Sequence, residues 1–138
     1  MYMNKKLLLY LLSLKGVFIS SCDYFDHRIE IINLSNYNIV LETYSDSVVD
    51  TNENNLTEYY YANIIEVGQK TNLTQSGTNG WPFYIRRSKN QMLNICVFNF
   101  DSLKKYQTIN FLVKHKIYKQ YSFSEREMVK RNWVIEFH

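Results

Sequence analysis

The sequence predicts a mainly β, single-domain protein. The expected fold is a β-sandwich of the immunoglobulin-like or transthyretin-like kind, or a partly open barrel, with one or two short helices near the C-terminus. Two observations support this prediction: short segments with β-type apolar patterns alternate with turn-forming residues, and residues 92–100 form a long apolar run. Twelve Tyr and eight Phe supply large side chains for a core.

The N-terminus has the parts of a secretory signal in their usual order. Lys5 and Lys6 precede an apolar run at 7–14, and Ile19-Ser20-Ser21-Cys22 follows. This ending resembles the lipobox of bacterial lipoprotein signal peptides, which implies cleavage before Cys22 and acylation of its thiol. We therefore expect a signal peptide at 1–21, a tether at 22–27 and one β-rich domain at 28–138.

The charge of the chain is concentrated in the segment expected to be removed. The whole chain carries +3, and residues 1–21 hold three lysines and no acidic residue, so the remaining domain is close to neutral. A nucleic-acid-binding domain normally has a basic excess. We therefore expect no nucleic-acid partner. Lys15 also interrupts the apolar stretch, which a membrane-spanning helix of about 20 apolar residues would not tolerate well.

The first half of the domain reads as strands and loops. Residues 28–32 and 38–44 alternate in strand fashion around the turn-forming segment 33–36, which predicts a hairpin. Residues 45–58 are acidic and polar, as expected of an exposed loop. Further strands are expected at 59–67, 71–74 and 81–85, with a loop at 75–80 and with Pro82 restricting the last strand to an edge or a strand start.

The second half contains the strongest strand signal. Residues 92–100 are apolar on both faces, which predicts a central strand. A short helix through Tyr106 is expected to begin at Asp101 or Ser102, and a second helix is expected at 108–114. Strands are predicted at 117–123 and 133–137. Between them, Ser124 and Glu127 form a capping box that predicts a helix to about Lys130.

Few residues point to catalysis or to metal binding. Cys96 lies in an apolar run, where a buried thiol behaves as a small hydrophobic side chain. The histidines, His27, His115 and His138, are far apart in sequence, and no nucleophile motif or phosphate-binding loop is present. We therefore expect no metal, no cofactor and no enzymatic activity.

Three aromatic side chains border the glycine-containing loop at 77–80. Trp81, Phe83 and Tyr84 could contact a sugar or a protein partner there, or they could plug the end of the sandwich, since large aromatic side chains are usually buried. The sequence leaves both interpretations open.

The mature chain resembles a group of small lipoproteins from Bacteroides-type gut bacteria. Residues 28–35, 95–103, 121–124 and 132–135 carry the resemblance. It implies an outer-membrane or periplasmic setting and brings no catalytic residue to carry over. Glycoproteins of these bacteria carry O-glycans at Asp-Ser followed by an apolar residue, so the resemblance makes Ser47 and Ser102 candidate glycosylation sites. At Ser102, a helix cap is an equally good explanation.

These observations predict a lipid-anchored protein of the bacterial cell envelope, held at the outer membrane through Cys22. Its expected role is non-catalytic: binding of a glycan or protein partner, or a structural role. Two alternatives stay open, a periplasmic immunity or inhibitor lipoprotein and a small hydrolase whose site has no recognisable motif.

Overall fold

The computed structural model describes residues 24–49 and 57–138. The predicted signal peptide and Cys22 lie outside the described residues, as does part of the expected acidic loop. The elements are, in chain order, β1 (Phe25–Asn33), β2 (Ile39–Tyr44), α2 (Thr57–Ala62), β3 (Lys70–Ser76), α3 (Gly80–Arg87), β4 (Met92–Asn99), α4 (Phe100–Tyr106), α5 (Ile109–Lys114), β5 (Lys119–Ser124), α6 (Glu125–Lys130) and β6 (Val134–Phe137).

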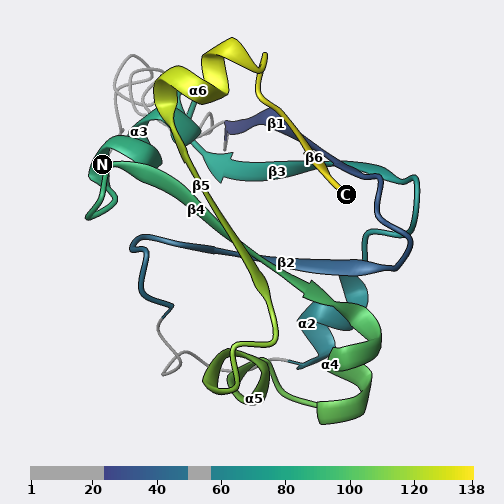
Figure 1. Cartoon of the computed structure of the whole chain (residues 1–138). Coiled ribbons are helices and arrows are strands. Elements are labelled where there is room, and N and C mark those ends of the chain that lie inside the picture. The colour runs from purple at the N-terminus through teal and green to yellow at the C-terminus, as the bar shows by residue number, and fades with distance from the viewer. Residues whose placement is uncertain (1–23, 50–56) are drawn as a thin grey trace, which may run out of the picture.

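The strands form two three-stranded sheets, one in the order β3-β1-β6 and the other in the order β2-β4-β5 (Figure 1). β1 pairs antiparallel with β3 and parallel with β6, whereas both pairings of β4 are antiparallel. The prediction of a mainly β domain is confirmed, and so is the central position of β4.

One core lies between the two sheets. Buried side chains from β1 and β6 meet side chains from β2 and β4, with the residues Ile29, Ile31, Ile39, Leu93, Ile95, Val97, Ile135 and Phe137 at its centre. A strand directs alternate side chains to opposite faces, so these strands each present one apolar face to the same core. The arrangement corresponds to the sandwich alternative of the prediction.

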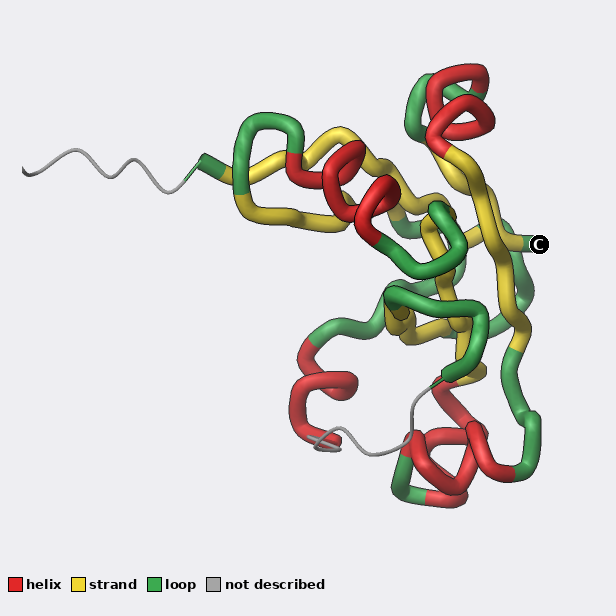
Figure 2. The backbone as a smooth tube through the Cα atoms, turned by 90° about the vertical axis from the view of Figure 1, so that its left-hand side faces the viewer, coloured by secondary structure: helices red, strands yellow, loops and turns green. Residues whose placement is uncertain are grey.

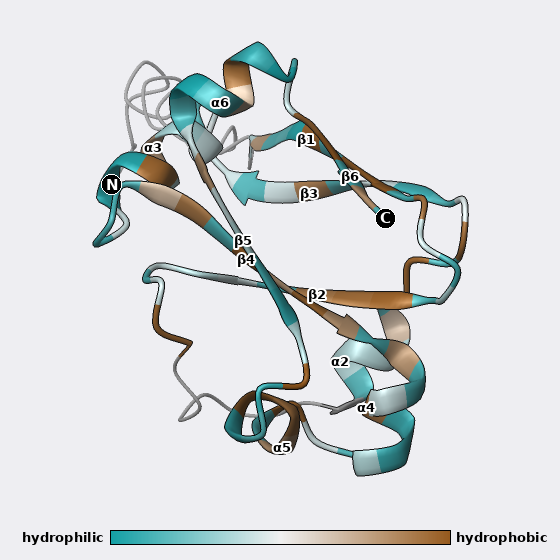
Figure 3. Ribbon diagram, in the orientation of Figure 1, coloured by the Kyte–Doolittle hydropathy of each residue, from teal (hydrophilic) through white to brown (hydrophobic). Residues whose placement is uncertain are grey.

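A second hydrophobic cluster covers the other face of the β2-β4-β5 sheet. Val40, Cys96 and Phe98 pack there against side chains from α2, α4 and α5, which Figure 1 shows on the side of this sheet opposite to β1, β3 and β6. β4 is therefore buried on both faces. Figure 3 shows hydrophobic residues along β4 and β2, whereas β3 has hydrophilic residues at both ends.

The predicted hairpin between residues 28–32 and 38–44 is wrong. β1 and β2 belong to different sheets, and the chain crosses between them after Asn33. The side-chain amide of Asn33 donates to the carbonyl oxygens of Tyr37 and Ile65 at 2.9 Å each, and its Oδ1 accepts from Ser35. These bonds satisfy the polar groups of the crossing, so β2 can bury its own apolar face in the shared core.

Two segments predicted as strands form helices. Residues 57–62 form α2, and residues 80–87 form α3, so helices are not confined to the C-terminal part. In α3, Trp81 and Ile85 are buried while Phe83, Arg86 and Arg87 are exposed, which is the spacing of a helix with one apolar face. Pro82 lies in the first turn, where its missing N–H costs no intrahelical hydrogen bond.

The predicted tether is shorter than expected. β1 begins at Phe25, and Phe25 and Asp26 pair with Ser76 and Gln75 of β3, so this part of the predicted tether belongs to the sheet. Asp26 is buried, and a buried carboxylate needs hydrogen bonds that only a fixed backbone provides.

The predicted elements of the C-terminal half are confirmed with small shifts. β5, α6 and β6 lie where the sequence placed them, and Ser124 and Glu127 make both bonds of the capping box. α5 begins after Thr108, whose side chain caps it. The cap of α4 is Asn99 rather than Asp101 or Ser102, because its Oδ1 accepts from the backbone N–H groups of both residues.

Candidate functional site

A polar cleft opens between the two sheets at one side of the sandwich. Its walls are β2, an edge strand of one sheet, and β3, an edge strand of the other. The cleft has a volume of about 410 Å³. It is lined by residues of both edge strands, of α2 and its following loop, and by one aromatic residue of α3: Leu41, Glu42, Thr43, Tyr59, Ala62, Asn63, Ile64, Ile65, Gln69, Thr71, Asn72, Leu73, Thr74, Gln75 and Trp81.

The backbone of β2 presents hydrogen-bonding groups to this cleft. Ile39 exchanges two backbone bonds with Ile65, of 3.0 and 2.9 Å, on the side of β2 away from β4. In an antiparallel strand, every second residue directs its N–H and C=O to the same side, so Leu41 and Thr43 face this side too. Among the described residues these groups have no partner, and the edge remains open beyond Ile39.

The facing edge of β3 is open in the same way. Glu30 donates to Trp133 next to β6, so Ile29 and Ile31 direct their backbone groups to β3, where they pair with Leu73 and Thr71. The intervening residues of β3, Asn72 and Thr74, therefore direct their backbone groups away from β1, toward the outer edge. Two sheet edges thus flank one cleft.

Trp81 forms one end of the cleft and is not a free ligand-stacking platform. Its side chain is only 2% exposed, its indole Nε1 donates to the carbonyl oxygen of Leu73 at 3.1 Å, and its ring contacts Tyr84 edge to face at 5.7 Å between centroids. Tyr84 is half-buried beside the same core. Phe83 is 57% exposed on the outer face of α3, so the structure does not bring the three predicted aromatic residues together.

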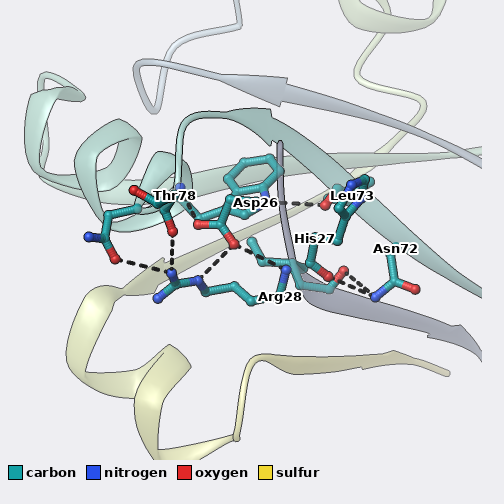
Figure 4. A network of polar contacts seen from close by, with 9 residues as sticks. Asp26, His27, Arg28, Asn72, Leu73 and Thr78 are labelled. Atoms are coloured by element: carbon teal, nitrogen blue, oxygen red, sulfur yellow. Dashed lines mark hydrogen bonds and ion pairs between the residues drawn. The ribbon is translucent and has the colours of Figure 1, made fainter. Parts of the chain in front are cut away.

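A buried carboxylate joins the start of β1 to the start of α3 (Figure 4). Asp26 accepts from the Arg28 Nε at 2.8 Å through Oδ1 and from the Trp81 backbone N–H at 3.0 Å through Oδ2. The Arg28 guanidinium also donates to the carbonyl oxygen of Thr78 and to Asn79 Oδ1, at 3.0 and 3.2 Å. Asn79 itself makes no side-chain cap bond to α3. Asp26 therefore supplies a cap from a distant strand.

This network keeps Asp26 ionised. Burial by itself would raise the pKa of the carboxyl group, but the hydrogen bonds from the Arg28 side chain, the Trp81 N–H and the Arg28 N–H hold that pKa below its ordinary value of 3.8. The negative charge lies at the N-terminus of α3, where the helix dipole also favours an anion.

The two predicted glycosylation sites differ in accessibility. Ser47 is exposed in the loop after β2, and its backbone carbonyl accepts from Gln120 at 2.7 Å. Ser102 is half-buried in the first turn of α4, where its N–H is bound to Asn99 at 3.3 Å. The geometry therefore favours Ser47 as the acceptor, and glycosylation at either serine stays a prediction.

The remaining residues considered for chemistry lie apart. Cys96 is buried between β4 and the helices, and burial raises the pKa of its thiol to about 12, so it stays protonated at neutral pH. His27, His115 and His138 lie on three different segments: His27 on β1 beside Thr74, His115 beside Phe111, and His138 at the end of the chain. In residues 24–49 and 57–138, no group of three His, Cys, Asp or Glu side chains has the spacing of a metal site.

Comparisons with known proteins identified no relative of this chain. No family model matches the chain, and neither the curated proteins nor the solved structures gave a significant match. Within the described part of the chain, the helices are too short or too polar to cross a lipid bilayer.

Neither the cleft nor the Asp26 network was predicted from the sequence. The pairing of β1 with β3 shifts register between Asp26 and Ile29, so the regular alternation of a strand would not have identified the contact between Asp26 and Arg28. The cleft gives no local sequence signal, because it depends on which strands end up at the sheet edges.

Proposed function

We propose that the protein is a lipid-anchored protein of the bacterial cell envelope that binds an extended segment of a partner protein in the cleft between β2 and β3. The anchor is Cys22, which follows the lipobox-like Ile19-Ser20-Ser21. The observation that carries the binding role is the open edge of β2, where the backbone groups of Leu41 and Thr43 face the cleft.

An open sheet edge binds a polypeptide by adding it as a further strand, with main-chain bonds giving affinity and side-chain pockets giving specificity. Here the chain already adds one short piece to this edge, because Ile65 pairs antiparallel with Ile39. A partner strand that continues along the edge would pair at Leu41 and Thr43. The hydroxyl group of Thr71 and the amide group of Gln75, which lie on the same face of β3 and line the opposite wall, would recognise polar side chains of that strand.

The cleft is tested with Thr43→Pro. Proline removes the N–H that the partner strand would use and places its ring at the edge, but it removes no bond of Thr43 to β4 because that N–H faces outward. The matched control is Thr43→Val, which keeps the N–H and the β-branched shape. A photo-crosslinking residue at position 71 would then be used to capture the partner in native cells.

We expect capture of the same protein by the unmodified chain and by Thr43→Val, and at least a tenfold loss with Thr43→Pro, the equivalent of about 1.4 kcal/mol. Equal capture by the proline variant, with unchanged circular dichroism, would contradict strand addition. If the captured protein is a toxin or a hydrolase, the binding role is that of an immunity or inhibitor protein.

The anchor is tested separately with Cys22→Ala. This change should abolish labelling with a palmitate analogue and release the protein from membranes. Since one acyl chain gives only marginal attachment and two give stable attachment, a fully lipidated protein should stay bound through a salt wash. Unchanged membrane association of Cys22→Ala would contradict the proposed anchor.

A further inference from the structure

We infer that the domain lies on its membrane with one defined surface, made by the start of β1 and the exposed side of α3, and that this surface contacts anionic lipid headgroups. The inference rests on the proposed acylation of Cys22. We call this the anchor-end surface; it comprises Tyr24, Phe25, Phe83, Arg86 and Arg87.

The anchor-end surface lies close to the acylated cysteine by covalent geometry. One residue, Asp23, lies between Cys22 and Tyr24, so two Cα–Cα steps join them, and a chain reaches at most about 3.6 Å per step. Tyr24 therefore lies within about 7 Å of the lipidated residue, whatever path the chain takes. So short a link holds the domain against the headgroup region.

Tyr24 is held firmly to the rest of the domain. Its carbonyl oxygen accepts from the Gly77 N–H at 2.6 Å, and Phe25 next to it pairs with Ser76 in the sheet. The Asp26 and Arg28 bonds then link the same strand to the first turn of α3 (Figure 4). Figure 2 shows α3 beside the start of β1. The anchor therefore fixes the position of α3 and not only that of β1.

The composition of this surface suits a membrane interface. Tyr24, Phe25 and Phe83 are 62%, 46% and 57% exposed, and aromatic side chains concentrate at the headgroup level of bilayers. Phe83, Arg86 and Arg87 are spaced three and four residues apart on α3, so they share one face. α3 contains no acidic residue.

The two arginines differ in their partners. Arg86 has its Nε 3.4 Å from Glu125, whereas no described carboxylate lies within ion-pair distance of Arg87, whose guanidinium lies 5.1 Å from the centre of the Phe83 ring. An exposed arginine stacked on an exposed aromatic ring presents a cation and an apolar face together. Anionic headgroups attract such cations by about 1 kcal/mol each, which corresponds to a change of about fivefold in binding.

The opposite end of the domain, formed by α4 and α5, serves as a control for the anchor-end surface. α4 and α5 also carry lysines and the partly exposed Phe111, but Figures 1 and 2 show these helices at the far end of the molecule from the start of β1. Composition alone would not distinguish the two ends. The position of the anchor does.

The inference is tested with full-length, lipidated protein carrying a fluorophore at one introduced cysteine. The labelled variants are Thr78→Cys, which lies beside Tyr24 and Phe25 and leaves Phe83 and Arg87 in place, and Phe111→Cys on α5. Cys96 is buried and its thiol stays protonated, so it reacts little with the label. Both proteins would be placed in vesicles of phosphatidylethanolamine and phosphatidylglycerol that contain brominated lipid as the quencher.

We expect a blue shift and quenching at position 78 and neither at position 111. Adding Arg87→Gln should lower the ratio of quenched to unquenched protein about fivefold, and Lys105→Gln on α4 should leave it unchanged. Replacing phosphatidylglycerol by phosphatidylcholine should weaken quenching at position 78 by a similar factor.

Flotation of the vesicles separates the two proposals. Protein that floats with the vesicles but shows equal quenching at both positions overturns the orientation and leaves the anchor intact. Protein that does not float overturns both. Quenching at position 78 that is insensitive to phosphatidylglycerol and to Arg87→Gln overturns the contact with anionic headgroups.

Discussion

The two sides of the sandwich differ: the side of β5 and β6 is closed by side-chain contacts, and the side of β2 and β3 contains the cleft. On the side of β5 and β6, the rings of Tyr121 and Phe137 meet at 5.0 Å between centroids, and the Lys119 Nζ reaches the carbonyl oxygen of His138 at 3.2 Å. On the side of β2 and β3, polar side chains line a cleft. One side of the domain is thus closed by contacts between side chains, whereas the other leaves backbone groups of Leu41 and Thr43 without a partner among the described residues.

The largest loss in the free energy of unfolding is expected from truncating a side chain on the closed side. Phe137→Ala removes a buried ring from the shared core, and such truncations cost about 4 kcal/mol because they leave a cavity. Urea unfolding would measure the loss. Thr71→Val on the open side is the matched comparison and should change the free energy of unfolding by less than about 0.5 kcal/mol. Similar losses for the two variants would mean that the sides do not differ in this way.

A smaller effect is expected at Asp26, which supports the Trp81 end of the open side. Asp26→Asn keeps the size of the side chain but replaces a charge-assisted bond to Arg28, and we expect a loss of about 2 kcal/mol at neutral pH. The pKa of Asp26 is lowered in the folded state, so its stabilising contribution is complete above the ordinary value of 3.8 and is lost as pH falls below it.

The difference between the unmodified chain and Asp26→Asn should therefore shrink when unfolding is measured well below pH 3.8. A difference that stays constant with pH would show that the charge of Asp26 is not what stabilises the start of α3. Asp26→Glu, which keeps the charge but misplaces it, separates charge from geometry.

A smaller loss of stability is expected at α6, the helix that joins β5 to β6 on the closed side. Ser124→Ala removes the side chain that accepts from the Glu127 N–H at the start of α6, and the loss of such a cap costs about 1 kcal/mol. Ser124→Thr keeps the acceptor and should recover most of the stability in thermal unfolding. Equal loss in both variants would exclude the capping bond as the cause.

The weakest protection of backbone N–H groups against hydrogen exchange is expected at the open edge of β2. The N–H groups of Leu41 and Thr43 have no acceptor among the described residues, whereas those of Val40 and Glu42 face β4. Amide hydrogen exchange measured by NMR should therefore be fast at Leu41 and Thr43 and slow at the two alternate residues. Uniform protection along β2 would contradict an open edge.

Local patterns predicted the elements that depend on neighbouring residues. The apolar run of β4, the capping box of α6 and the strands β5 and β6 follow from residues within one or two turns of each other, so the chain alone specified them. The aromatic segment at 81–85 shows the limit. Its composition favours a strand, but burying Trp81 and Ile85 on one side requires a helix, and Asp26 from another strand caps it.

Hydrophobic periodicity and short motifs lie in adjacent residues, so the sequence was enough to predict a mainly β domain with a buried central strand at 92–99, and it carries the lipobox-like Ile19-Ser20-Ser21-Cys22. Three features became visible only in the folded chain: β1 and β2 belong to different sheets, β2 and β3 are edge strands that face one cleft, and Asp26 caps α3. Each of these depends on contacts between residues about 30 or more positions apart, or on which strands are left unpaired. Strand pairing and burial across the whole fold settle such contacts, and no local preference does.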